Sequence, residues 1–181
     1  MTGIGPGAFV AVFGGSGVGK DSILDYAHAH AHDDRLVFVR RSITRAAGLG
    51  EDHLPVSDAE FAAAEHAVAW AAHGLSYGLP IGVDDIIRNG GIAVANVSRG
   101  VLSELGRRYA RLYTVNVTVP DDVRAARLLA RGREDAAAIR ERISRPDPAP
   151  GVTCDLEIEN DGTLPEAAER LLTFLRTLAF T

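Results

Sequence analysis

The sequence contains one glycine-rich segment whose residue types and spacing can bind phosphate. The segment fits the pattern G-x-x-x-x-G-K and lies between an apolar run and a helical pattern. Its four glycines allow positive φ angles, which turn backbone N–H groups inward toward an oligophosphate. Lys20, the only lysine in the chain, adds a compact cation between the last two phosphates. The predicted phosphate-binding residues are Gly14, Gly15, Ser16, Gly17, Val18, Gly19 and Lys20.

The residue after this lysine departs from the usual motif, which has Ser or Thr there as a magnesium ligand. Here the position is Asp21, followed by Ser22. A carboxylate is a good ligand for a hard cation, so Asp21 and Ser22 are the candidate Mg²⁺ ligands, directly or through water. Asp21 is also an acid in the first turn of the predicted helix, where it favours the helix dipole. The two roles are compatible.

The elements around this loop alternate between strands and helices, which predicts a parallel sheet covered by helices on both faces. We predict strands over Ala8–Phe13, Leu36–Arg40, Val68–Ala72, Ile92–Asn96, Leu112–Val119 and Leu156–Glu159. We predict helices over about 21–30, 57–66, 83–89, 101–109, 120–130, 135–144 and 163–178, and a loop over 145–151. The fold class is therefore α/β, a three-layer sandwich.

Two stretches interrupt this alternation. Residues 42–82 are polar and rich in Gly and His, and we expect them to form a small subdomain over the edge of the sheet. Residues 131–145 are short and dense in arginine. The prediction is one domain over 1–181, with a core built from 1–41, 83–130 and 146–181.

Composition limits the classes of protein that fit. The chain has 181 residues, 46% of them hydrophobic, and a net charge of −5, which indicates one globular domain and excludes disorder as the main state. No run of 18 apolar residues indicates a membrane span, and no basic residue precedes the first apolar run as in a signal peptide. With the single cysteine Cys154, these features favour a cytoplasmic protein.

Charge is uneven along the chain. Residues 99–145 carry 11 basic and 6 acidic groups, although the chain as a whole is acidic. This pattern does not favour nucleic-acid binding, but the basic block could hold a small polyanion. The alternative is an arginine-rich, solvated helix face with glutamate partners.

Several motifs outside the loop resemble those of guanylate kinases over nearly the entire chain. They are Ser42-Ile43-Thr44-Arg45, Gly50-Glu51-Asp52-His53, Tyr77-Gly78, the arginines from Arg127 to Arg142, and Asn160-Asp161. The resemblance implies ATP as phosphoryl donor with Mg²⁺, an acceptor-binding subdomain at about 42–82, and an arginine-rich lid at about 131–145. It also implies that Asn160 lies near the ATP base.

The catalytic residues that this resemblance implies are Lys20, Arg127, Arg131 and Arg142. The three arginines would close over the phosphoryl group during transfer, where such groups stabilise charge. The alternative is that Arg124, Arg127 and Arg131, which recur at helical spacing, form a salt-bridged surface.

Departures from guanylate kinases indicate another branch. The carboxylates that read guanine in guanylate kinases are replaced here by Ala69-Trp70-Ala71 and by the segment from Ala95 to Arg99. A pocket without carboxylates would not accept the N–H donors of guanine. Lys20-Asp21-Ser22 and Asn96-x-Ser98-Arg99 resemble the ribose 1,5-bisphosphate phosphokinases of phosphonate degradation. The resemblance implies ATP-dependent phosphorylation of the 1-phosphate of ribose 1,5-bisphosphate, which gives 5-phosphoribosyl 1-diphosphate.

The candidate substrate residues follow from that interpretation. Such an acceptor is already close to doubly charged at neutral pH, since the second pKa of a phosphate monoester is about 6, so no general base is needed. Arg45 and Arg99 are candidates for the acceptor phosphates, and Asn96 or Glu51 for the sugar hydroxyls. The hydroxyl donors are Ser42, Tyr77 and Ser98, and His53 is a further possible contact.

Two alternatives stay open. One is a guanylate or other nucleoside-monophosphate kinase, and the other is a non-catalytic guanylate-kinase-like module that binds a protein partner. Such modules usually lose the loop lysine, which this chain keeps. We expect a small-molecule sugar phosphate as the partner, with no nucleic acid and no membrane, and a monomer or homodimer.

Overall fold

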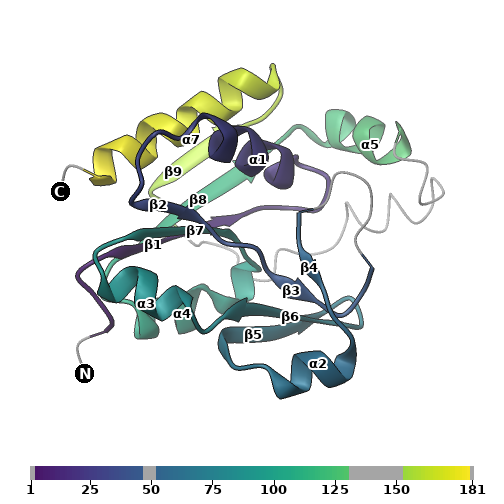
Figure 1. The fold of residues 1–181 in the computed structure, drawn as a ribbon. Helices are drawn as coiled ribbons and strands as arrows, with labels where there is room; N and C mark the ends of the chain where they lie inside the picture. The colour runs from purple at the N-terminus through teal and green to yellow at the C-terminus, as the bar shows by residue number, and fades with distance from the viewer. Residues whose placement is uncertain (1–2, 47–51, 131–152, 180–181) are drawn as a thin grey trace.

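The main sheet has five parallel strands. In the computed structural model, which describes residues 3–46, 52–130 and 153–179, the strand order is β2-β7-β1-β8-β9 (Figure 1). The strands are β1 (Ala8–Phe13), β2 (Leu36–Phe38), β7 (Ile92–Asn96), β8 (Leu112–Thr118) and β9 (Leu156–Glu159). All their pairings are parallel, as the alternation of strands and helices predicts.

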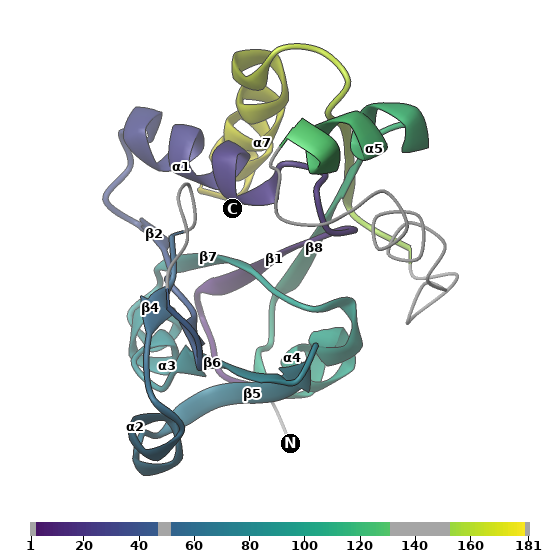
Figure 2. The ribbon, with the colours of Figure 1, turned by 90° about the vertical axis from the view of Figure 1, so that its right-hand side faces the viewer.

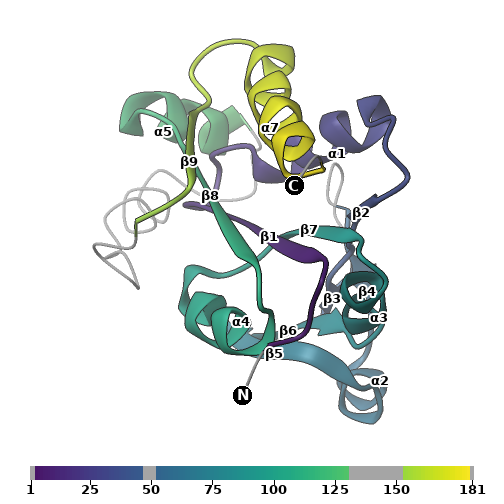
Figure 3. The same cartoon turned by 90° about the vertical axis from the view of Figure 1, so that its left-hand side faces the viewer.

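Helices cover both faces of this sheet. On one face lie α1 (Lys20–His30) and α7 (Leu164–Ala179), side by side; on the other lie α3 (Val83–Arg88) and α4 (Leu102–Arg108) (Figures 1 and 3). The sequence of β1 explains this, because successive strand residues point to opposite faces. Val10 and Val12 pack with α1 and α7, whereas Phe9, Ala11 and Phe13 pack with α3 and α4. The predicted three-layer sandwich is confirmed.

A second sheet forms within residues 42–80. Its order is β4-β3-β6-β5, and its elements are β3 (Ser42–Ile43), β4 (Leu54–Pro55), α2 (Asp58–Ala63), β5 (His66–Ala72) and β6 (Leu75–Pro80). Figures 1 and 2 show it on the side of the main sheet that carries α3 and α4. Ala67, Val68 and Leu79 are buried in the same core cluster as Phe9. The second sheet therefore packs onto the core of the first.

The helix predicted over 57–66 is shorter than expected. Its start is confirmed, since Ser57 and Glu60 form a reciprocal capping box. The helix ends at Ala63, because the residues from His66 onward pair with β6 as strand β5. This pairing over long sequence distance overrides the local helical pattern.

The remaining predicted elements match closely within the described residues. A short 3₁₀ turn, η1 (Arg99–Val101), precedes α4, and α5 (Asp121–Ala130) follows β8. The predicted helix over 135–144 and the loop over 145–151 lie outside the described residues. Among the helices that the structure describes, none combines the length and the apolar character needed to cross a membrane.

Candidate functional site

The phosphate-binding loop, residues 14–20, connects β1 to α1. Gly14, Gly17 and Gly19 have φ angles of 146°, 86° and 92°, which residues other than glycine rarely adopt. Gly15 was also expected at positive φ, and that expectation is wrong. Gly15 instead makes room for a neighbour, because an added Cβ would lie 3.0 Å from Cζ of Arg124 on α5.

Lys20 folds over the loop that precedes it. Its Nζ donates to the carbonyl oxygens of Gly14 and Gly15, each at 2.9 Å. Lys20 is also the first residue of α1, with Gly19 as the N-cap. The ammonium group thus lies at the loop and at the positive end of a helix, where an anion is stabilised.

Two further side chains hold the loop from outside. Buried Asn160 donates from Nδ2 to the carbonyl of Val18 at 2.8 Å, and Arg124 donates from Nε to the carbonyl of Ser16 at 2.8 Å. Asn160, expected near a nucleotide base, therefore contacts the loop backbone. It comes from the end of β9, so the far edge of the sheet supports the loop.

Arg127 is the one predicted lid arginine within the described residues. Its Nη1 lies 4.0 Å from where a Cβ on Gly19 would be, which places the guanidinium beside the loop. Within the described part of the chain, Nη1 is buried and has no hydrogen-bond partner. A buried N–H without a partner is costly and suits a site that binds an anion. Arg131 and Arg142 lie outside the described residues.

Asp21 connects the loop to a neighbouring strand. Its Oδ1 accepts a hydrogen bond from Nδ2 of Asn96 at 2.6 Å and lies 3.7 Å from Nη2 of Arg41. Asn96 is the last residue of β7, which pairs with β1. The carboxyl ends of two adjacent parallel strands thus meet at Asp21, the position at which α/β sheets bind ligands.

The donor set around Asp21 fits a magnesium ion. Mg²⁺ prefers one or two protein oxygens completed by water and substrate phosphates. Asp21 supplies a carboxylate and Ser22, in the same helical turn, a hydroxyl. No group of three metal-binding side chains is found among residues 3–46, 52–130 and 153–179, so a protein-only metal cage is not formed there.

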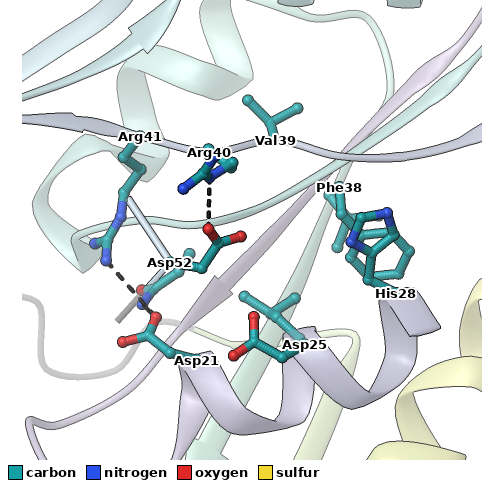
Figure 4. A pocket seen from close by; sticks show the side chains of 11 residues that line it. Asp21, Asp25, His28, Phe38, Val39, Arg40, Arg41 and Asp52 are labelled. Carbon is teal, nitrogen blue, oxygen red and sulfur yellow. Dashed lines mark hydrogen bonds and ion pairs between the residues drawn. The ribbon is translucent and has the colours of Figure 1, made fainter. Parts of the chain in front are cut away.

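A pocket opens beside α1, next to the loop (Figure 4). We name it the α1 pocket. Its lining comes from α1, β2, the end of β7 and the segment that leads into β3: Asp21, Leu24, Asp25, His28, Phe38, Val39, Arg40, Arg41, Asp52, Val94 and Asn96.

Carboxylates are abundant in this pocket, although none of them comes from the segments 69–71 and 95–99, where the sequence lacks carboxylates. Asp21, Asp25 and Asp52 all line it, and Arg41 and Arg40 form ion pairs with Asp21 and Asp52. The mixed lining can bind both an anionic group and hydrogen-bond donors.

The predicted substrate residues are divided between three places. Asn96 lines the α1 pocket. Ser42 and Tyr77 lie on the paired strands β3 and β6 beside Arg41, whose Cζ is 5.9 Å from the Tyr77 ring centre. Arg99, the first residue of η1, lies over Phe13 at the end of β1, with its Cζ 4.8 Å from the ring centre. Its guanidinium donates to Oδ1 of Asn116 on β8 at 3.2 Å, and Arg99 does not line the α1 pocket.

The other predicted substrate residues are not gathered at the pocket. The hydroxyl of Ser98 accepts from Gly100 N and caps the η1 turn. Arg45 is exposed on a loop, and His53 is buried with Nε2 at 3.3 Å from the Arg45 carbonyl oxygen. Glu51 lies outside the described residues.

Sequence reasoning missed Arg40, Arg41 and Asp25 as pocket residues. One signal was present, because Asp21 and Asp25 are four residues apart and so share a helix face. Arg41 directly precedes the motif Ser42-Ile43-Thr44-Arg45 but belongs to no motif itself. Charged residues at such positions are indistinguishable from a solvated surface without the fold.

Comparisons with known proteins identify the family, although no family model matches the chain. A ribose 1,5-bisphosphate phosphokinase PhnN from Pseudofrankia inefficax is 55% identical over 177 residues, covering 93% of this chain and 90% of that protein. The chain belongs to the ribose 1,5-bisphosphate phosphokinase family. The family member from Chelativorans sp. is 44% identical over 184 residues, covering 96% and 87%.

Two other matches concern a longer relative and a solved structure with a similar fold. A bifunctional ribose 1,5-bisphosphokinase–thymidine phosphorylase from Cupriavidus pinatubonensis is 45% identical over 177 residues; the match covers 94% of this chain but 29% of that protein. The guanylate kinase from Anaplasma phagocytophilum superposes with a TM-score of 0.65 at 20% identity, over 94% and 85% of the two chains. The fold is therefore that of guanylate kinases.

Proposed function

We propose that this chain transfers the γ-phosphoryl group of ATP to the 1-phosphate of ribose 1,5-bisphosphate. The products are ADP and 5-phosphoribosyl 1-diphosphate. The observation that carries the proposal is the 55% identity to a phosphokinase of this activity over 93% of the chain. The Lys20-Asp21 loop with its positive-φ glycines supports it from the site itself.

The donor side of the reaction uses the loop. Inward-facing N–H groups of residues 14–20 bind the phosphates of ATP, and Lys20 exchanges its two carbonyl partners for phosphate oxygens. Arg127, with its buried Nη1 beside Gly19, adds positive charge near the transferred group. Asp21 and Ser22 would hold Mg²⁺, which when bound neutralises phosphate charge.

The acceptor side needs no general base. An oxygen of the 1-phosphate attacks the γ-phosphorus, the bond from that phosphorus to the β–γ bridging oxygen breaks, and ADP leaves. The acceptor is nearly dianionic at neutral pH, since its second pKa is about 6. The main barrier is repulsion between two anions, which Lys20, Arg127 and the pocket arginines reduce.

The proposal assigns roles to whole segments as well. Residues 42–82, which contain the second sheet, act as the acceptor-binding subdomain, and residues 131–145 act as the lid. The cytoplasmic location and the monomeric or homodimeric state stay predictions.

The carboxylates of the α1 pocket favour one second candidate. Asp25 and Asp52 could accept hydrogen bonds from the N–H groups of guanine, and the fold is shared with a guanylate kinase. Phosphorylation of guanosine monophosphate is therefore the alternative that any test must include.

The proposed function is tested by turnover with purified protein. We expect ADP formation from ATP that depends on both Mg²⁺ and ribose 1,5-bisphosphate, and a Lys20→Met variant that is slower by about 100-fold or more. An Arg35→Gln variant is the matched control, because Arg35 is exposed and pairs locally with Asp33. Activity that does not need ribose 1,5-bisphosphate, or that survives in Lys20→Met, would contradict the proposal.

A further inference from the structure

The α1 pocket and the phosphate-binding loop share the start of α1. Asp21, the residue after Lys20, is both a pocket residue and the second residue of the helix. A molecule bound in this pocket therefore lies next to the group that the loop holds. The charges that line the pocket then decide which part of an acceptor can lie there.

Arg41 supplies positive charge at the loop end of this pocket. Its side chain is 15% exposed and points toward Asp21, with Nη2 at 3.7 Å from Oδ1 (Figure 4). Its Cζ also lies 5.9 Å from the Tyr77 ring centre, so contacts on two sides fix its position. A guanidinium has five N–H donors and can keep these contacts while it donates to a phosphate.

Asp25 supplies negative charge one helical turn away. Its carboxylate lines the same pocket, and within the part of the chain that the structure describes it makes no hydrogen bond or ion pair. Burial and the nearby charges of Asp52 and Asp21 raise the pKa of Asp25, so the position is unfavourable for the carboxylate in the protein alone. A carboxylate can accept hydrogen bonds from hydroxyl groups.

The two charges favour different parts of one ligand. A phosphate is attracted to Arg41 and repelled by Asp25, whereas a hydroxyl donor is attracted to Asp25. Arg40 and Asp52 form a second ion pair in the pocket lining, and their side chains are more exposed than those of Arg41 and Asp21. A phosphate ester whose carbon skeleton carries hydroxyls matches this order, with its phosphate at the loop end.

We propose that Arg41 binds the acceptor phosphate and that Asp25 accepts a hydrogen bond from a hydroxyl of the sugar ring. Both residues then determine how the acceptor is positioned beside the loop. This inference rests on the proposed function and adds two acceptor-binding residues to it.

The test is steady-state kinetics at saturating Mg²⁺ on the whole chain with ribose 1,5-bisphosphate. In Arg41→Gln and in Asp25→Ala we expect the KM for the sugar bisphosphate to rise about 10-fold to 100-fold, the loss expected for one hydrogen bond to a charged group. The KM for ATP should change by less than about twofold. Arg41→Lys and Asp25→Asn should recover part of the loss, because they keep a cation and an acceptor oxygen.

Controls separate binding from folding. Arg35→Gln and Asp34→Asn change the same residue types outside the pocket and should leave both KM values unchanged. The melting temperatures of the pocket variants should stay close to that of the unmodified chain.

The outcomes distinguish the two proposals. An unchanged KM for the sugar bisphosphate in Arg41→Gln and Asp25→Ala, or an equal rise in both KM values, would overturn this inference alone. Absence of turnover of ribose 1,5-bisphosphate by the unmodified chain would overturn the proposed function and this inference with it.

Discussion

At the scale of single residues, Asp21 lies where the phosphate-binding loop meets the α1 pocket. It follows Lys20, accepts a hydrogen bond from Asn96 and lies within ion-pair distance of Arg41. Its carboxylate therefore faces one group from the end of β7 and one from the segment that leads into β3. A neutral Ser or Thr at this position could not pair with Arg41 in the same way.

Replacing Asp21 tests its role toward magnesium. Asp21→Asn keeps the size and an oxygen acceptor but removes the charge, so we expect the Mg²⁺ concentration for half-maximal activity to rise about tenfold, or roughly 1.4 kcal/mol. The measurement is a Mg²⁺ titration of turnover, with Asp34→Asn as the control and circular dichroism to establish folding. A titration curve that matches the unmodified chain would exclude Asp21 as a metal ligand.

How much of the site the sequence predicts depends on the range of its contacts. The phosphate-binding loop is predictable, because its glycines and lysine act within seven consecutive residues. Arg41 and Asp25 are not predictable, because they line one pocket only when the segment between β2 and β3 lies beside α1 in the fold. Arg45, by contrast, belongs to a recognisable motif, but in the structure it is exposed outside the α1 pocket.

At the scale of elements, one buried carboxylate joins α3 to α4. Asp84, 3% exposed, accepts from Nε and Nη2 of Arg108 at 2.9 and 2.6 Å and from the hydroxyl of Tyr109 at 3.1 Å. Burial, with the adjacent Asp84 charge, raises the pKa of Tyr109 well above its ordinary value, so the phenol stays protonated and donates. This network fixes the two helices that cover one face of the main sheet.

Removing that carboxylate tests the stability of the layer. Asp84→Ala leaves Arg108 and the Tyr109 hydroxyl without their partner, so we expect a loss on the order of 3 kcal/mol in the free energy of unfolding. Asp85→Ala, which removes an exposed carboxylate paired with Arg88, should change it by less than about 0.5 kcal/mol. Urea unfolding measures both variants. If the two variants lost the same free energy of unfolding, the buried network would not contribute to stability.

The start of α7 gives a pH-dependent prediction. The carboxylate of Glu166 accepts from Thr163 N at 2.9 Å and from its hydroxyl at 2.7 Å, and these hydrogen bonds lower its pKa from 4.5. A lowered pKa in the folded state gives stability that is present above pH 4.5 and is lost as pH falls through the folded value. Glu166→Gln should therefore lower the melting temperature at pH 7 and have little effect at lower pH.

The comparison that checks this is a series of melting curves from pH 7 to pH 3, with Glu157→Gln as the control, because Glu157 is an exposed residue of β9. The difference between Glu166→Gln and the unmodified chain should shrink as the pH falls. A difference that is the same at every pH would rule out the charge of Glu166 as its cause.

The sequence predicts the main sheet better than the second one, for a physical reason. β1 and β7 are apolar runs and β8 is rich in alternating β-branched residues, so all three can be recognised locally. β6 contains Ser, Gly and Pro and is a strand because it pairs with β5 across a two-residue turn. In that turn, His73 and Gly74 both have positive φ angles, as a tight two-residue hairpin requires. The glycine of this turn was the signal in the sequence that could have predicted the hairpin.

At the scale of the whole molecule, the proposed function divides the reaction between the two sheets. The main sheet carries the phosphate-binding loop, and the segment from Phe38 to Arg41 passes from it into the second sheet along the α1 pocket (Figure 4). Under the proposed function, this segment connects the sheet that binds the donor to the sheet that binds the acceptor. The shared fold with a guanylate kinase leaves the choice of acceptor to the residues of the pocket.

The most direct test of the proposed function is a reaction in which two acceptors compete for the same phosphoryl donor. ATP labelled at the γ-phosphate is mixed with the chain, Mg²⁺ and equal concentrations of ribose 1,5-bisphosphate and guanosine monophosphate, and the labelled products are separated at early times. We predict that the label enters 5-phosphoribosyl 1-diphosphate. Label found mainly in guanosine diphosphate would contradict it.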